Sequence, residues 1–366
     1  MNIKYINLSV SEDEYNKNIS PLIKEVLFKG DFIGGEVVEL FEKNFAKYCG
    51  SKYAISVASG TDALILALIA YGIGKNDEVI TVSNSFIATA NAIVMAGAKP
   101  VFVDIEDDLL IDYQKIEESI TSKTRAIMPV HLMGLSCDMD EINKIAKKYN
   151  LVVIEDAAQS VGSIYKEKKT GVLGDVGCFS LHPLKNLSGI GDGGIITTNQ
   201  KSIAKKLLQL RNNGLKDRDS QVVFGRVSRL DTIKASVLNY RLQYLDAIIS
   251  ERIKKAKKYI ENLKKVKHLE LIEYEQEIKL HSYHIFVVKV KKRDELQQFL
   301  LDNGIETKIH YPKLIHKNKT YKSNKYHLPK SEKLVKKILT LPLANVSNEE
   351  IEYICKKINQ FYMKEN

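Results

Sequence analysis

The chain lacks several features that would assign it to a familiar class of protein. Its four cysteines show no C-x-x-C spacing, so we expect neither a zinc site nor a disulfide framework and interpret all four as reduced, packed thiols. No apolar run approaches the length that crosses a bilayer. The first residues have no apolar segment of a secretory signal behind their lysines. We therefore expect a cytoplasmic protein that is not bound to a membrane.

The charge is unbalanced, because 55 Lys and Arg against 45 Asp and Glu give a net charge of +10. Basic residues cluster in stretches such as 252–258. There the apolar residues recur at helical spacing through Tyr259, Ile260 and Leu263, which places the basic residues on a solvated face. Aromatic residues do not alternate with the basic ones and no binding module is present, so we expect no nucleic-acid partner. A basic surface also attracts a doubly anionic substrate.

The alternation of short strands and helices predicts an α/β fold, and 366 residues suggest two unequal domains. Several strand candidates are apolar almost throughout, as in strands buried on both faces of a largely parallel sheet. The candidates are 78–82, 100–104, 126–130, 151–154, 177–181 and 194–198. Helical patterns at 61–71, 88–95 and 140–149 lie between them. Repeated strand–helix–strand units predict helices on both faces of the sheet.

The character of the sequence changes near residue 240. A lysine-rich helical stretch at 245–267, a strand at 283–290 and helices at 293–303 and 348–362 predict a smaller α+β domain. We therefore predict a large domain over 1–240 and a small domain over 241–366. The segment up to about residue 50 is expected to wrap against the small domain or against a partner subunit.

Three groups of residues lie where the strands of the predicted sheet end, which is where open α/β sheets bind ligands. In the first, the small residues Ser59, Gly60 and Thr61 lead directly into an apolar helix. Backbone N–H groups and the helix dipole would then point at one spot and suit a phosphate. Taken alone, an ordinary N-cap is the more frequent explanation.

In the second group, Glu155 and Asp156 end an apolar strand, where a buried acid needs a cationic partner. A protonated pyridine nitrogen is such a partner and makes the ring an electron sink; an acid that caps a helix or pairs with an arginine is the common alternative. In the third, Lys185 lies between a buried strand and the glycine-rich turn 191–194. A lysine in a partly dry, cationic site has a lowered pKa and is available for a Schiff base. A solvated loop lysine is the alternative.

The order and spacing of these groups resemble the fold-type I pyridoxal-phosphate enzymes, and more narrowly the DegT/StrS family of sugar-nucleotide aminotransferases. The resemblance covers nearly the whole chain. It rests on seven stretches: Phe32-Ile33-Gly34-Gly35, Ser59-Gly60-Thr61-Asp62-Ala63-Leu64, Phe86-Ile87-Ala88-Thr89-Ala90, Glu155-Asp156-Ala157-Ala158-Gln159, His182-Pro183-Leu184-Lys185-Asn186-Leu187, Ser228-Arg229-Leu230-Asp231 and His310-Tyr311-Pro312. The resemblance implies a large, mostly parallel-sheet cofactor domain and a smaller C-terminal domain.

The resemblance also implies roles for individual residues. Lys185 would carry pyridoxal phosphate covalently and act as general acid/base once displaced, and Asp156 would pair with the ring nitrogen. The other cofactor-binding residues would hold the phosphate, stack on the ring or meet its hydroxyl group: Ser59, Gly60, Thr61, Phe86, Gln159 and Ser180. No metal is implied. The residues implied to lie near the substrate are Phe32, His182, Arg229, His310 and Tyr311, although His182 equally suits a packed core histidine.

One position departs from the family pattern. Many relatives have an asparagine two residues before Arg229, and it reaches the cofactor phosphate of the neighbouring subunit. This chain has Val227 there, so that contact is missing or is made by another group such as Arg226. The family's active site lies between two subunits, so the resemblance implies a homodimer with shared active sites.

The resemblance implies transfer of an amino group from glutamate to carbon 3 of a dTDP-linked 3-keto-6-deoxyhexose, for amino-sugar biosynthesis in glycans such as O-antigen. The turn Gly191-Asp192-Gly193-Gly194 is more typical of members that act at carbon 3, whereas many that act at carbon 4 have glutamate at position 192. Amination of a 4-keto sugar is therefore the alternative. Related dehydratases carry histidine in place of Lys185. A non-catalytic, cofactor-bound regulator is a rival from another class, and the Asp156/Lys185 pair argues against it.

Overall fold

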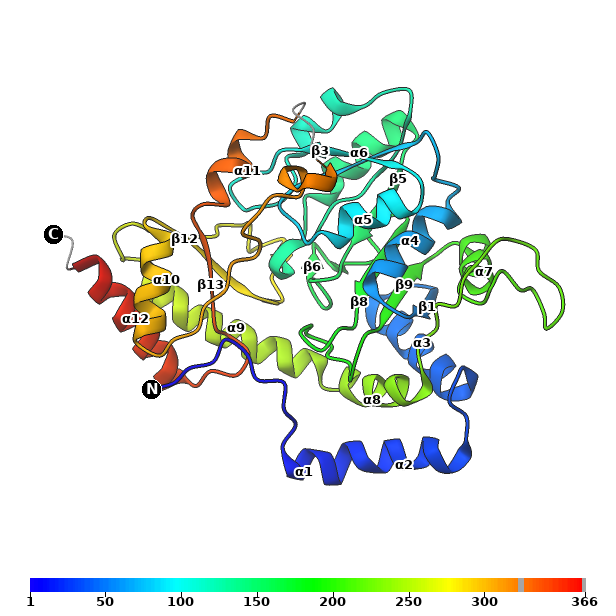
Figure 1. Ribbon diagram of the computed structural model, residues 1–366, viewed down its shortest axis with the longest axis horizontal. Coiled ribbons are helices and arrows are strands. Elements are labelled where there is room, and N and C mark those ends of the chain that lie inside the picture. Colours follow the sequence, from blue (N-terminus) through cyan, green and yellow to red (C-terminus); the bar gives the residue numbers. More distant parts are fainter. Residues whose placement is uncertain (322–325, 364–366) are drawn as a thin grey trace.

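A seven-stranded sheet forms the centre of the molecule in the computed structural model, which describes residues 1–321 and 326–363 (Figure 1). The strand order is β1-β9-β8-β5-β4-β2-β3, and every neighbouring pair is parallel except those that β9 makes with β1 and β8. The bounds are β1 (Tyr53–Val57), β2 (Glu78–Val82), β3 (Lys99–Val103), β4 (Thr124–Ile127), β5 (Val152–Asp156), β8 (Val176–Ser180) and β9 (Gly194–Thr198). The predicted α/β fold is confirmed, and β1 and the antiparallel course of β9 are additions to it.

Helices cover both faces of this sheet, as predicted. One face packs against α4 (Gly60–Ala70), α5 (Ala88–Met95) and α7 (Lys201–Leu210). The other packs against α3 (Gly35–Cys49), α6 (Met139–Tyr149) and α8 (Thr232–Leu242). The central strands are buried from both sides, and all five residues of β2 and of β9 are buried. The central strands are continuous apolar runs because helices cover both faces of the sheet and bury the side chains that point to either side.

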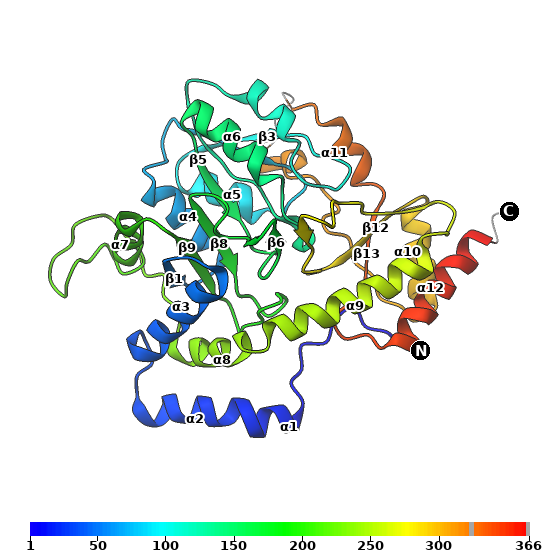
Figure 2. The same ribbon diagram turned by 180° about the vertical axis from the view of Figure 1, so that it is seen from behind.

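A smaller part of the molecule begins with the long helix α9 (Leu245–Leu263), which runs away from the large sheet (Figures 1 and 2). The antiparallel sheet β10-β12-β13 consists of β10 (Leu269–Leu271), β12 (Phe286–Val290) and β13 (Ile338–Leu341). It shares a core with α9, α10 (Arg293–Asp302) and α12 (Asn348–Met363). The predicted strand at 283–290 begins three residues later, because Tyr283 has a φ of 45° and breaks the extended backbone.

A small sheet joins the two parts of the molecule. Its strands are β6 (Ile164–Tyr165), β7 (Lys168–Lys169) and β11 (Lys279–Leu280), so that β11 pairs with a strand from the large part. The remaining helical turns are η2 (Tyr113–Lys115), η3 (Glu117–Ser119), η4 (Leu132–Gly134), η5 (Ile315–Lys317), η6 (Lys319–Tyr321) and α11 (Pro329–Leu334). The domain boundary predicted at residues 240 and 241 falls near the end of α8, and that division remains a prediction.

The N-terminal segment differs from the expectation. Only its first residues pack on the small part, where Ile3 bridges Ile305 and lies in the core. The helical turns α1 (Glu12–Glu14), η1 (Tyr15–Ile19) and α2 (Ser20–Lys29) then run beneath α8 in Figure 1. Helix α3 packs on the large part instead of the small one, because Phe41 and Phe45 bury their rings there, and contact with a partner subunit remains a prediction.

Helix α9 also corrects the expectation that its basic residues are solvated. Lys254 and Lys257 are exposed, but Arg252 is buried with 9% of its surface accessible. Arg252 is four residues before Ala256 and seven before Tyr259, which places it on the buried face of the helix. No helix in the described part of the chain is long and apolar enough to cross a membrane.

Candidate active site

The carboxyl ends of β1, β2, β5 and β8 meet at one edge of the large sheet, because these strands run in the same direction. Lys185 follows β8 in a turn that its own backbone closes, with its N–H donating to the carbonyl of His182 at 2.9 Å. Its side chain is partly buried. Burial lowers the pKa of Lys185 to about 8, against an opposing effect of Asp156. No ion pair to this amine occurs among the residues that the structure describes. The amine is therefore deprotonated more readily than an ordinary lysine, as a nucleophile requires.

Asp156 is the last residue of β5 and is buried. One carboxylate oxygen accepts a hydrogen bond from the Thr89 hydroxyl at 2.7 Å, and the other accepts one from the Ala158 N–H at 3.2 Å. Burial raises the pKa of Asp156, while these two donors and Lys185 oppose the rise. A buried carboxylate has four lone-pair sites and here uses two of them within the protein. It can therefore still accept a hydrogen bond from a cationic N–H group.

The predicted phosphate site lies where β1 leads into α4. Ser59 caps this helix, since its hydroxyl accepts from the Asp62 N–H at 3.1 Å. Gly60 lies directly against the end of β8, because a Cβ atom on it would lie 2.7 Å from the Cβ of Ser180. The structure thus brings Gly60 and Thr61 of the helix start together with Ser180. The first N–H groups of a helix have no intrahelical acceptor and favour an anion.

Phe86 and Gln159 both contact Tyr311. The Phe86 side chain is 53% exposed, and its ring centroid lies 5.5 Å from that of Tyr311. The Gln159 amide accepts from the Met133 N–H at 2.8 Å and donates to the Tyr311 hydroxyl at 3.1 Å. Because Met133 supplies a donor, the Gln159 oxygen must face it, and the amide nitrogen keeps one N–H for another acceptor. An exposed aromatic face and an available amide donor suit a planar ring with a hydroxyl group.

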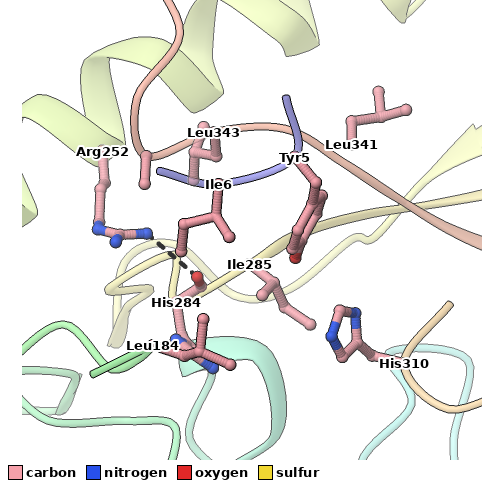
Figure 3. A pocket seen from close by; sticks show the side chains of 10 residues that line it. Tyr5, Ile6, Leu184, Arg252, His284, Ile285, His310, Leu341 and Leu343 are labelled. Atoms are coloured by element: carbon pink, nitrogen blue, oxygen red, sulfur yellow. Dashed lines mark hydrogen bonds between the residues drawn. The ribbon is translucent and has the colours of Figure 1, made fainter. Parts of the chain in front are cut away.

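Of the five predicted substrate residues, Tyr311 belongs to this set and His310 lies next to it, with its ring against that of Tyr311. His310 meets the Thr340 hydroxyl through Nδ1 at 3.0 Å, and its ring borders a cavity together with Tyr5 (Figure 3). Burial, assisted by the nearby charge of Lys185, lowers the pKa of His310 to about 4. His310 is therefore neutral at physiological pH. His182 instead accepts the N–H of Leu184 at 3.2 Å, so it stabilises the turn that carries Lys185.

Phe32 and Arg229 are not brought to this site. Phe32 is 48% exposed, and Arg229 donates to the side chain of Asn212 at 3.3 Å. No hydrogen bond, ion pair or ring contact joins either residue to Lys185 or Asp156 in the parts of the chain that the structure covers. Their predicted roles toward the substrate remain predictions.

Three contributions to the site were not predicted. Thr89 belongs to the matched stretch 86–90, but only Phe86 was given a role there; its position in the first turn of the predicted helix 88–95, within that stretch, was an available signal. The backbone N–H of Met133, which orients Gln159, carries no signal in the side-chain sequence. Tyr5 and the buried Arg252 come from distant segments and border the same region (Figure 3).

The residues fit pyridoxal phosphate. Gly60 keeps the helix start open at Ser180, since even a methyl group at this position would collide there. Asp156 is a buried carboxylate with acceptor capacity for a ring N–H, and Lys185 is an amine with a lowered pKa. Phe86 offers a ring face and Gln159 an amide N–H. These donor types match the phosphate, the ring nitrogen, the carbonyl carbon, the ring face and the ring hydroxyl of the cofactor.

Comparisons with known proteins agree with this assignment. The profile of the DegT/DnrJ/EryC1/StrS aminotransferase family matches residues 13–359. The chain is 44% identical over 363 residues to the dTDP-3-amino-3,6-dideoxy-alpha-D-galactopyranose transaminase of Aneurinibacillus thermoaerophilus, covering 98% of this chain and 99% of that protein.

Two solved structures have the same fold. One is DesV of S. venezuelae in complex with a ketimine intermediate, with a TM-score of 0.95 and 34% identity over 99% of this chain and 98% of that one. The other is NtdA of Bacillus subtilis with bound cofactor PMP, with a TM-score of 0.91 and 32% identity over 98% of this chain and 85% of that one. The chain therefore belongs to the DegT/DnrJ/EryC1/StrS aminotransferase family, whose members are pyridoxal-phosphate-dependent transaminases.

Proposed function

We propose that the protein transfers the amino group of glutamate to carbon 3 of a dTDP-linked 3-keto-6-deoxyhexose. The observation that carries the proposal is the amine of Lys185, with its lowered pKa, beside the buried carboxylate of Asp156. The choice of sugar is supported by the 44% identity to a protein named as a dTDP-3-amino-sugar transaminase. The product would enter glycans such as O-antigen, and the reaction would take place in the cytoplasm.

Each residue of the site has a defined task in this reaction. Bound pyridoxal phosphate supplies an electron sink that stabilises negative charge at the reacting carbon. Asp156 holds the positive charge at the ring nitrogen by its own negative charge. Lys185 takes a proton from the reacting carbon and returns it during transfer, which its lowered pKa favours. His310 and Tyr311 border the sugar, where the neutral His310 donates or accepts hydrogen bonds without adding charge.

The position of amination rests on the turn after Lys185. Asp192 is exposed there, and Gly191 has a φ of 140° that other residues rarely adopt. Aspartate at position 192 is one methylene shorter than the glutamate that many members acting at carbon 4 carry there. Incubation with glutamate and either a 3-keto or a 4-keto dTDP-6-deoxyhexose, followed by mass and NMR measurement of the product, tests the choice. Amination of the 4-keto sugar alone would reject carbon 3 and leave the enzyme class standing.

We also propose a homodimer in which Phe32 and Arg229 of each subunit border the other subunit's active site. Exposed large apolar side chains close to Phe32 and Arg229 in the sequence support the proposal, because a partner subunit would remove them from water. They include Phe32 (48%), Ile33 (56%), Phe224 (94%) and Val227 (57%). Arg226 pairs with Asp62 of its own chain at 3.3 Å, at the helix that binds the phosphate. Sedimentation that shows an active monomer at assay concentration would refute the dimer.

A further inference from the structure

Arg252 is a buried cation without a carboxylate partner. Its Nη1 donates to the backbone carbonyls of Tyr283 and His284, both at 3.1 Å. No aspartate or glutamate forms an ion pair with Arg252 in residues 1–321 and 326–363, and its Nε and Nη2 have no acceptor within the same residues. Burying an unpaired charge is costly, so such a group is usually kept for a ligand of opposite charge.

A small cavity of about 40 Å³ borders this guanidinium group. Figure 3 shows Arg252 entering from α9, Tyr5 from the N-terminal segment and His310 from the opposite side, with Leu184 at the base. A larger adjoining pocket of about 430 Å³ is lined by both Arg252 and Lys185. The unpaired cation therefore opens onto the same pocket as the amine of Lys185.

The groups around this cavity are bases or neutral donors. Burial lowers the pKa of Arg252 to about 10, which leaves it charged at physiological pH, and burial also lowers the pKa of His284 and of His310. The hydroxyl of Tyr5 has no hydrogen-bond partner among the described residues. Glu251, next in sequence, pairs with Lys254 at 2.6 Å instead of with Arg252. No acidic side chain lines the small cavity, so Arg252 presents its positive charge there, while Glu251 borders the larger pocket with its own charge paired.

We propose that Arg252 and the Tyr5 hydroxyl form an oxyanion subsite that takes a carboxylate of the amino donor. The planar fork of arginine matches a carboxylate through two parallel hydrogen bonds. A single guanidinium group satisfies one planar carboxylate, whereas the diphosphate of a nucleotide sugar presents two tetrahedral phosphates. An amino acid carries its amine and its carboxylate on the same carbon, so a carboxylate held here keeps the amine near Lys185. The inference rests on the proposed amino transfer.

The two half-reactions test the subsite separately. In the first, the cofactor-loaded enzyme is mixed with L-glutamate alone and the change in cofactor absorbance is followed. In the second, enzyme loaded with pyridoxamine phosphate is mixed with the 3-keto dTDP-sugar. The variants are Arg252→Lys, which keeps the charge and loses the fork, and Tyr5→Phe, which loses only the hydroxyl.

Arg293→Lys is the matched control. Its Nη1 also donates to two backbone carbonyls, those of Val335 at 3.5 Å and Ile338 at 3.2 Å, but Arg293 pairs with Asp294 and lines neither pocket. Because Arg293 lies away from both pockets, the control is expected to leave both half-reactions within about twofold of wild type.

Loss of hydrogen bonds to a charged ligand predicts a rise of about 10- to 100-fold in the half-saturating glutamate concentration for Arg252→Lys. One hydroxyl contributes less, and we expect a rise of about 3- to 10-fold for Tyr5→Phe. Glutarate, a dicarboxylate without an amine, should compete with glutamate in wild type and lose affinity in parallel. The sugar half-reaction should stay within about twofold of wild type for both variants.

Two outcomes contradict the proposal. A defect confined to the sugar half-reaction would assign Arg252 to the diphosphate of the nucleotide sugar, and unchanged glutamate dependence in both variants would remove the subsite. If Arg252→Lys fails to fold, Tyr5→Phe decides, because its hydroxyl bonds to nothing in the described fold. The glutamate half-reaction needs no sugar. A protein that reacts with glutamate but with no keto sugar would therefore refute the proposed function alone.

Discussion

Replacing Asp156 by asparagine separates the chemistry of the site from the stability of the fold. The side chain is buried, and its two oxygens accept from Thr89 at 2.7 Å and from Ala158 at 3.2 Å. Asparagine has the same shape and keeps one acceptor oxygen, but it cannot hold the positive charge of a pyridinium nitrogen. Loss of one preorganised charge contact costs about a hundredfold or more in rate. That factor equals about 2.7 kcal/mol of transition-state stabilisation.

The stability of the apoprotein should move in the opposite direction. Burial raises the pKa of Asp156, so its charged form is less favourable in the folded chain than in the unfolded one. The contribution of such a carboxyl to stability is present at pH values below its unfolded pKa, and it is lost as the pH rises from that value through the raised pKa of the folded chain. Asp156→Asn removes the charge, and its apoprotein should unfold at the same or a higher temperature than wild type at neutral pH.

The assays are steady-state turnover and thermal unfolding of the apoprotein. Asp175→Asn is the control. Asp175 lies just before β8, at the end of β5 and β8 that is opposite to Asp156, and accepts the Val153 N–H at 2.9 Å. It should lower stability and leave turnover within a few-fold of wild type. Turnover of Asp156→Asn within a few-fold of wild type would show that another group holds the ring charge and refute the reasoning.

Three further predictions follow from single contacts. Apoprotein should capture pyridoxal phosphate faster as the pH rises through about 8, the lowered pKa of Lys185; a rate that stays low until the ordinary value of 10.5 would contradict this. Thr89→Val should lower kcat about 3- to 10-fold by removing the donor to Asp156, whereas Thr89→Ser should restore it. Gly60→Ala should weaken cofactor binding about tenfold, measured by titration of apoprotein, because its Cβ would meet that of Ser180.

Much of the large sheet was predictable because burial on both faces leaves a strong signal. The strands at 78–82 and 194–198 were predicted with their observed bounds. Asp156 and Lys185 were predicted as site residues because Asp156 ends such a run and Lys185 follows another. The strand Tyr53–Val57 was missed, since Ser56 interrupts its short apolar run. In the structure the Ser56 hydroxyl donates to the Glu42 carboxylate at 2.6 Å. The antiparallel course of β9 depends on chain reversal at residues 181–193, which no local pattern encodes.

Contacts between distant segments were the least predictable. Arg252 lies in a run of basic residues, and its burial results from the packing of α9 against residues 283 and 284. Tyr5 reaches the same cavity only because the first residues pair with residues near 305. Periodicity reports the faces of one element and carries no information on which distant segment covers them. The cavity that Tyr5, Arg252 and His310 line is built largely from such contacts.

The attachment point of the cofactor is the central claim, and mapping it is the most direct test. Borohydride reduction of the cofactor-loaded protein, followed by proteolysis and mass spectrometry, identifies the lysine that carries the pyridoxyl group. We predict a single modified peptide that contains Lys185, and no modified peptide from Lys185→Ala treated in the same way. Label on any other lysine of the wild-type protein would contradict the account of the site.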